Sequence, residues 1–337
     1  MKSWPVFLTV WMMVLCSIHA PEARCETVRL PITIDLPLLR SLIVQQAYPD
    51  PGETARVIDR AGGCNQVVLS APQVSVEQEQ LRFQTTVRLK WGTPIGGGCF
   101  APLAWEGAVA LWQRPRINDR WQLSFETIDS ALLDRNGKPV KMAAVVWNQV
   151  KGYVHGYLQQ ISIDLAPPVG DMKNFLLPLF DSSHQSAAKQ FLQSMRPEQP
   201  VLTADSLQVN ILAEAETTGL VREGRYVPMA SPEALAKVMD LWQTWDALLI
   251  HLISQFSNKP LSDDDRHDLM DTILTVRYEF EEALSKQKLT NDFVRGQFVW
   301  SWQQLESGFR RHLSSSPSDN LLGYLAFFTA ADALVAL

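Results

Sequence analysis

The chain has 337 residues, of which 20% are charged, and its formal net charge at neutral pH is -6. A chain of this length can form two domains, and the moderate charge is that of an ordinary water-exposed surface. No block of basic residues is present that could hold a phosphate backbone. We therefore expect no nucleic-acid partner.

The N-terminal residues have the three parts of a secretory signal. Lys2 is a single cation, residues 6–18 are uncharged and apolar, and a short stretch with Ala23 and Cys25 follows. The apolar run is too short to span a bilayer as a stable helix. We predict that residues 1–25 are removed by cleavage after Cys25, that no transmembrane anchor remains, and that the mature protein is periplasmic.

Two cysteines remain after this cleavage, Cys64 and Cys99, and each directly follows glycines that can form a turn. An even number of cysteines in an oxidising compartment favours a disulfide. We predict a bond between Cys64 and Cys99 that stabilises the fold by about 3 to 4 kcal/mol. A redox or metal-binding pair is the alternative, but the Cys-x-x-Cys spacing and a nearby histidine are missing.

Residues 26–219 are predicted to form an α+β domain. Alternation over residues 28–34 predicts a strand, and Asp35 is placed to cap the helix that follows over residues 38–47. A mostly antiparallel, curled sheet comes next. Its strands are expected over residues 67–69, 74–76, 81–91, 105–112 and 121–128, with a turn at Asn136-Gly137.

The clearest of these strands runs from Leu81 to Trp91, with its apolar side chains on one face only. Helical spacing then predicts a helix over residues 143–158 that packs on the sheet. A strand is expected over residues 161–165, and another around residues 207–211. Two short helices are expected between them, over residues 172–180 and 187–195.

Residues 220–337 are predicted to form an all-α antiparallel bundle. Helix starts are expected at Ser231, Ser262 and Thr290, and the apolar stretch 321–337 forms the last helix, in which Asp332 is the only charge. The expected fold class is therefore α+β, with a curled antiparallel sheet on amphipathic helices followed by a helical bundle.

Glu306 is the one candidate catalytic residue. The segment Glu306-Ser307-Gly308-Phe309 resembles the Glu-Ser-x-Phe start of soluble lytic transglycosylase domains, whose glutamate is the general acid and base. The later segments of that motif, Gly-Leu-Met-Gln and Asn-Tyr, do not occur in this sequence. We interpret Glu306 as a solvated helix residue and assign no catalytic residue.

The sequence also indicates no metal or cofactor site. Acidic residues gather at residues 263–271, but a calcium loop needs a glycine at its sharp turn and a closing glutamate, and both are missing. Carboxylates at the start of a helix are explained by the helix dipole. The six histidines are not spaced as ligand pairs.

Tryptophans concentrate in the first half of the chain, where they can pack in a core, stack on sugars or line an acyl cavity. Core packing is the commoner use of any single tryptophan. As the candidate binding surface for an apolar ligand we select a set of inward-facing or aromatic residues on the sheet. These are Phe83, Leu89, Trp91, Trp105 and Trp121.

The order of elements in residues 28–213 resembles the tubular lipid-binding (TULIP-like) domains of bacterial envelope proteins. In such domains a curled sheet wraps a long helix around an apolar channel, so the resemblance implies a lipid or another apolar ligand.

A second resemblance is to the noncatalytic N-terminal region of Gram-negative periplasmic proteins, longer members of which continue into a lytic transglycosylase domain. The segments that carry it are Leu36–Arg40, Gly63–Asn65, Gly92–Pro94 with Gly98-Cys99, and Tyr324–Phe327 with Ala330–Leu334. In those longer proteins the catalytic domain would begin beyond the position of Leu337.

The leading hypothesis is a noncatalytic periplasmic envelope protein, whose sheet domain binds an apolar or envelope-derived ligand and whose helical domain docks a partner, such as the cell-wall machinery. One alternative is a murein lytic transglycosylase or its accessory module. The other is a purely structural module.

Overall fold

The computed structural model describes residues 24–60, 62–138, 140, 144–177, 185–217, 261–286, 288, 291–315 and 321–336. The predicted helix from Ser231 and the predicted domain boundary near residue 219 lie outside the described residues. Most of the predicted signal, residues 1–23, also lies outside the described residues. The first strand begins at Arg24, two residues before the predicted start of the mature protein. None of the helices that can be seen is long and apolar enough to cross a membrane.

The first sheet is built on two long strands that come from distant parts of the chain. Strand β1 (Arg24–Asp35) pairs antiparallel with β10 (Ser206–Thr217) along their whole length. The short strands β8 (Arg196–Pro197) and β9 (Val201–Leu202) extend it beside β10. Alternate residues are fully buried, which confirms both predicted strands: Leu30, Ile32 and Ile34 on β1, and Leu207, Val209 and Ile211 on β10.

The second sheet is an antiparallel meander in chain order from β2 to β7, as predicted. Its strands are β2 (Thr54–Arg60), β3 (Asn65–Glu77), β4 (Gln80–Ile95), β5 (Gly98–Ile117), β6 (Gln122–Leu133) and β7 (Ser162–Asp164). On β4 the side chains of Leu81, Phe83, Val87 and Leu89 are buried, while those of Arg88 and Lys90 are exposed. The sheet therefore has one buried and one wet face.

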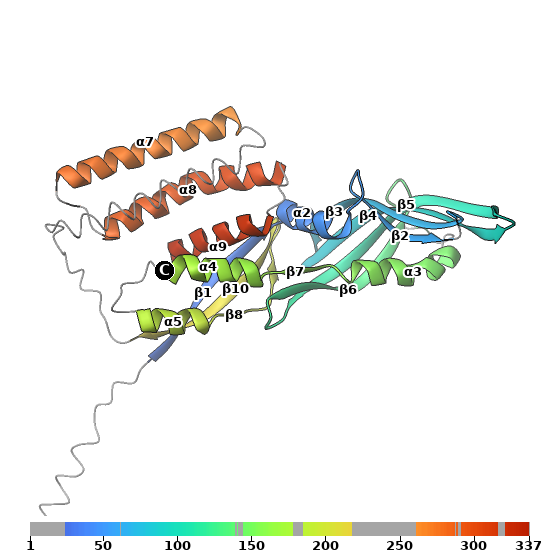
Figure 1. The fold of residues 1–337 in the computed structure, drawn as a ribbon, viewed down its shortest axis with the longest axis horizontal. Coiled ribbons are helices and arrows are strands. Elements are labelled where there is room, and N and C mark those ends of the chain that lie inside the picture. Colours follow the sequence, from blue (N-terminus) through green and yellow to red (C-terminus); the bar gives the residue numbers. More distant parts are fainter. Residues whose placement is uncertain are drawn as a thin grey trace, which may run out of the picture.

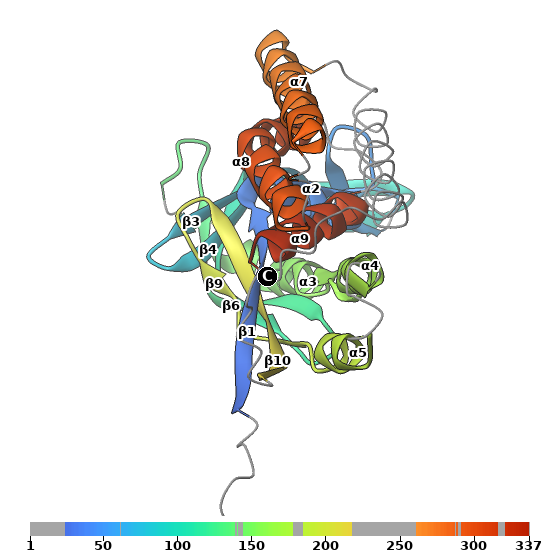
Figure 2. The same ribbon diagram turned by 90° about the vertical axis from the view of Figure 1, so that its left-hand side faces the viewer.

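Four helices pack on the two sheets (Figures 1 and 2). They are α2 (Leu36–Ala47), α3 (Ala144–Leu158), α4 (Ala166–Leu176) and α5 (Gln185–Gln193). Helix α2 lies on β3, α3 contacts β2 and α5 contacts β10. Buried residues of the helices and of both sheets form a single main core.

Three helices follow toward the C-terminus: α7 (Asp263–Ser285), α8 (Asn291–Ser315) and α9 (Leu321–Ala336). The predicted start of α7 is confirmed, because the Ser262 hydroxyl accepts a 3.1 Å hydrogen bond from the Asp265 N–H. Helix α7 packs on α8, and a smaller core forms between α7, α8 and α9.

Helix α9 belongs to both cores. It packs on α4 and β1, where Leu321, Leu325, Ala330 and Ala333 join the main core. On another side, Tyr324 and Phe328 join the smaller core with residues of α8. The helical region and the sheets are thereby joined through α9.

One local prediction is wrong. Asp35 stands at the N-cap position of α2, but its side chain makes no capping hydrogen bond. The first amide of the helix, that of Leu36, donates instead to the carbonyl of Asp205 at 2.9 Å. The Asp35 carboxylate faces Arg310 of α8, at 3.5 Å, so a tertiary ion pair has replaced the local cap.

Candidate ligand site and charge cluster

An apolar cavity of about 210 Å³, partly open to solvent, lies between α4, α8 and α9. Phe298 of α8 forms one wall, and the exposed Asp171 of α4 stands at the rim. The other lining residues are Gly323, Ala326, Phe327, Ala330 and Ala331 of α9. An apolar cavity of about 150 Å³ is large enough to hold benzene, so this one can hold a short acyl segment or a single ring.

The cavity arises from the sequence of α9. Its lining residues recur at intervals of three and four, which places them on one face of the helix. That face carries glycine and alanine at three central positions, Gly323, Ala326 and Ala330, so it leaves space where leucines would fill it. Phe298 and Phe327 then bound the space with rings.

The five residues predicted to bind a ligand lie elsewhere, against the main core. Phe83 and Leu89 are buried on the inner face of the second sheet. Trp91, Trp105 and Trp121 are half-buried and pack against the same core. None of the five lines the cavity between α4, α8 and α9, and their role in binding stays a prediction.

Trp105 has a clear structural task. A β-carbon added to Gly107 would lie 2.3 Å from Cζ2 of the Trp105 ring and 2.3 Å from the Leu133 carbonyl oxygen. The ring therefore lies over the glycine and covers backbone that has no side chain of its own. This contact gives Trp105 a packing role in the sheet.

A charge cluster lies where α8, α9 and β1 meet, and its centre is Arg310. The guanidinium donates from Nε to Glu306 Oε1 at 2.7 Å and from Nη2 to Asp332 Oδ2 at 3.1 Å. Nη1 lies 3.5 Å from Asp35 Oδ2 and donates to the Thr33 carbonyl at 3.4 Å. The side chain is only 13% exposed, and such buried ion pairs are sensitive to the loss of one partner.

Aromatic side chains hold the cluster from the other side. The Arg310 guanidinium carbon lies 4.4 Å from the centre of the Phe328 ring, a cation–π contact. The Trp302 indole N–H donates to Asp332 Oδ1 at 2.9 Å. Trp302 also packs edge-on against Phe327, with ring centres 5.3 Å apart. Since Phe327 lines the cavity, Trp302 touches both the cavity wall and the charge cluster.

Burial dominates the acid–base behaviour of the cluster. It raises the pKa of Asp332 to about 6, although the Arg310 charge and the Trp302 hydrogen bond act in the opposite direction. Burial also raises the pKa of Asp35, again against the effect of Arg310. The cluster thus places three carboxylates around one guanidinium, and protonation of Asp332 falls within an accessible pH range.

Glu306 is a member of this cluster. Its side chain is 36% exposed, and one carboxylate oxygen is engaged by Arg310 within its own helix. Across the described segments, we find no group of three or more His, Cys, Asp or Glu residues that could hold a metal ion.

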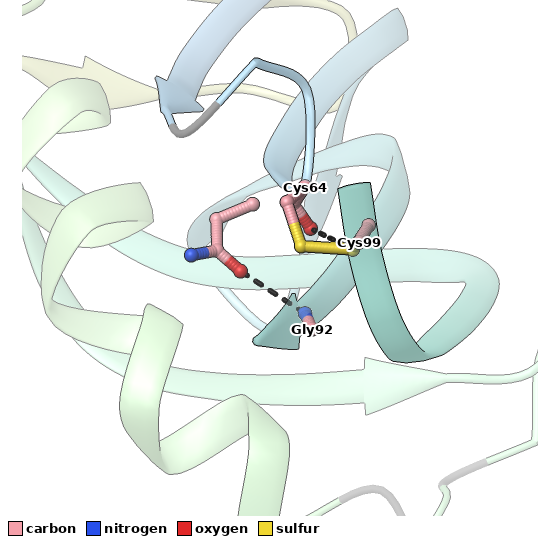
Figure 3. The surroundings of a disulfide bond; sticks show 4 residues. Cys64, Gly92 and Cys99 are labelled. Atoms are coloured by element: carbon pink, nitrogen blue, oxygen red, sulfur yellow. Dashed lines mark hydrogen bonds between the residues drawn. A yellow bond between two sulfur atoms is a disulfide. The ribbon is translucent and has the colours of Figure 1, made fainter. Parts of the chain in front are cut away.

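The disulfide between Cys64 and Cys99 is present, as predicted, and spans 35 residues. It ties the β2–β3 turn to the β4–β5 hairpin (Figure 3). Beside it, the Gly92 N–H donates to the side-chain oxygen of Asn65 at 3.0 Å.

Sequence reasoning missed the cavity-lining residues of α9 and the partners of Arg310. For the cavity, a signal was available: small residues at helical spacing within the apolar stretch 321–337. For Arg310, the sequence separation from Asp35 is 275 residues, so only the fold could bring the two together.

No protein-family model and no curated protein matches the chain. Among solved structures, a search finds a crystal structure of lipopolysaccharide binding protein, with 13% sequence identity and a TM-score of 0.18. The alignment covers 60% of this chain and 53% of the other, so the chain spans about half the length of that protein.

Proposed function

We propose that this is a noncatalytic, exported envelope protein that binds an apolar ligand. The observation that carries the proposal is the cavity between α4, α8 and α9, with its glycine, alanine and phenylalanine lining. Ligand sites are typically concave and mostly apolar, with a few polar groups at defined positions. Here the polar group is the Asp171 carboxylate at the rim.

The ligand is an acyl chain or a similar apolar group with its polar end at the mouth. Burial of each methylene contributes about 0.8 kcal/mol before losses, so a short segment suffices for measurable binding. The negative charge of Asp171 disfavours a carboxylate at the mouth and favours a neutral or zwitterionic head group.

Export is supported by the signal-like N-terminal sequence and by the disulfide, since such bonds persist in oxidising compartments. A docking role for the helical region is supported by apolar side chains that α7 exposes, among them Met270, Leu274 and Tyr278. We propose that the protein is exported to the periplasm and that its helical region docks to the cell-wall machinery there.

The test is isothermal titration of delipidated protein with a lysophosphatidylcholine below its critical micelle concentration. Ala326→Leu and Ala330→Leu fill the cavity, so each is expected to weaken binding at least tenfold. Ala187→Leu, the same change at an exposed position of α5, is the matched control and should bind as the wild type does. Equal affinity in all four proteins would refute the cavity as the binding site.

A further inference from the structure

The end of the β4–β5 hairpin extends beyond the rest of its sheet. The pairing of β3 with β4 ends at Gln66 and Lys90, and that of β6 with β5 ends at Leu133 and Ala108. Residues 91–95 and 98–103 pair only with one another. Figure 1 shows the hairpin projecting at one end of the molecule. We call residues 91–103 the ribbon.

The ribbon exposes apolar side chains and contains no charged residue. Ile95 is 60% exposed, Phe100 67% and Leu103 49%. A water-facing turn is usually polar, because exposed apolar side chains favour association and aggregation. Three such side chains on one projection indicate a surface that is covered in use.

The ribbon is also rigid by construction. A two-stranded hairpin alone is marginally stable in water, yet this one is fixed to the neighbouring turn by the Cys64–Cys99 disulfide and by the bond from Gly92 to Asn65 (Figure 3). The disulfide holds Cys99, which lies between the Gly96-Gly97 turn and Phe100, and the hydrogen bond holds Gly92 on the opposite strand. They hold the tip in an extended position, where it cannot fold back and bury its own side chains.

The charges directly behind the ribbon are mainly positive, although the whole chain carries -6. Arg88 and Lys90 are exposed on the outer face of β4, and Arg60 is exposed next to the β2–β3 turn. The carboxylates nearby are Asp59, which accepts from Gln66 at 3.1 Å, and Glu106, which pairs with Arg135 at 3.0 Å. An uncharged apolar tip backed by cations complements an anionic lipid surface.

We propose that the ribbon docks this protein onto an anionic lipid bilayer, with Ile95, Phe100 and Leu103 entering the interface and Arg88 and Lys90 meeting the head groups. This interaction does not require the cavity. The apolar side chains supply partitioning, and the cations supply a salt-sensitive attraction.

The test is cosedimentation of the oxidised protein with vesicles of phosphatidylglycerol and phosphatidylcholine, and with vesicles of phosphatidylcholine alone. The double variant Ile95→Ser, Phe100→Ser is expected to bind anionic vesicles at least tenfold more weakly than the wild type. The matched control is Ile128→Ser, Val201→Ser, which removes two exposed apolar side chains outside the ribbon and should bind as the wild type does. Arg88→Gln, Lys90→Gln should remove most of the preference for anionic vesicles.

Because these positions are exposed, the variants should fold, which far-ultraviolet circular dichroism and thiol titration verify. Lysophospholipid binding in the cavity should be the same in wild type and ribbon variant, so failure of either proposal is recognised separately. Equal vesicle binding by the wild type and the ribbon variant overturns the docking proposal. So does a wild-type protein that is dimeric without lipid and becomes monomeric through Phe100→Ser, since the ribbon would then bind a second copy.

Discussion

Individual side chains in this molecule are used for tertiary contacts even where a local role was available. Asp35 occupies a helix N-cap position but gives its carboxylate to Arg310. Asp332, the only charge of the last apolar stretch, accepts from Arg310 and Trp302. Burying a carboxylate without a partner costs free energy. This cost explains why Asp35 and Asp332 both pair with the Arg310 guanidinium.

Glu306 is expected to have no catalytic role. Its carboxylate accepts a hydrogen bond from Arg310 within the same helix, and the sequence lacks the remaining segments of the transglycosylase motif. Purified wild-type protein and the Glu306→Gln variant should both fail to release anhydromuropeptides from murein sacculi, as measured by liquid chromatography and mass spectrometry. Release by the wild type that is lost in Glu306→Gln would show that the chain is an enzyme.

At the scale of the element, the disulfide depends on the space that Gly92 leaves beside it. A β-carbon on Gly92 would lie 2.6 Å from Cys99 Sγ and 3.2 Å from Cys64 Sγ. Gly92 thus leaves room for the bond within a strand, at a position where no unusual backbone angle is needed. The disulfide contributes stability because it closes a long loop of the unfolded chain.

Replacing both Cys64 and Cys99 with alanine should lower the free energy of unfolding by about 3 to 4 kcal/mol. Gly92→Ala in the oxidised protein should cost about 1 to 3 kcal/mol through overpacking. The cost should be smaller when both cysteines are alanine, because the 3.0 Å contact with the Phe100 carbonyl oxygen remains but the contacts with the sulfur atoms do not. Urea unfolding followed by circular dichroism measures the free energy of unfolding of the wild type and of Gly92→Ala, each with and without the two cysteines. Gly98→Ala is the control, because its β-carbon would come no closer than 3.6 Å to another group. An equal cost of Gly92→Ala with and without the disulfide would contradict the steric explanation.

At the scale of the whole molecule, the Arg310 cluster joins β1, α8 and α9, and therefore the sheets and the helical region. Since burial raises the pKa of Asp332 to about 6, the native state binds its proton more tightly than the unfolded chain does. The stabilising effect of that proton is complete below the unfolded pKa near 4, and it is lost as the pH rises through about 6.

Stability is therefore expected to fall between about pH 4 and pH 7, with Asp332 contributing on the order of 2 to 3 kcal/mol to the decline. Asp332→Asn should remove that part, while the raised pKa of Asp35 leaves a smaller slope. The groups that act on Asp332 are Arg310, Trp302, Glu306 and Asp35. Urea unfolding at half-unit pH intervals measures the effect, and an unchanged slope in Asp332→Asn would rule out this residue as its source.

The sequence alone determined the features that depend on local periodicity. Alternating apolar residues predicted β1, β4 and β10, helical spacing predicted α2 and α3, and Ser262 marked the start of α7. The two cysteines outside the predicted signal predicted the disulfide. For the strands and helices, the informative residues lie within a few positions of one another. For the disulfide, only two cysteines remain to pair in the oxidising compartment that we predict.

The tertiary structure decided which distant residues meet. Periodicity shows that α9 is apolar, but not that its glycine and alanine face opposes α4 and leaves a cavity. It shows that Asp35 precedes a helix, but not that Arg310, 275 residues later, competes for its carboxylate. Burial of a surface depends on what packs against it, and that is fixed by the whole chain rather than by any one segment of it.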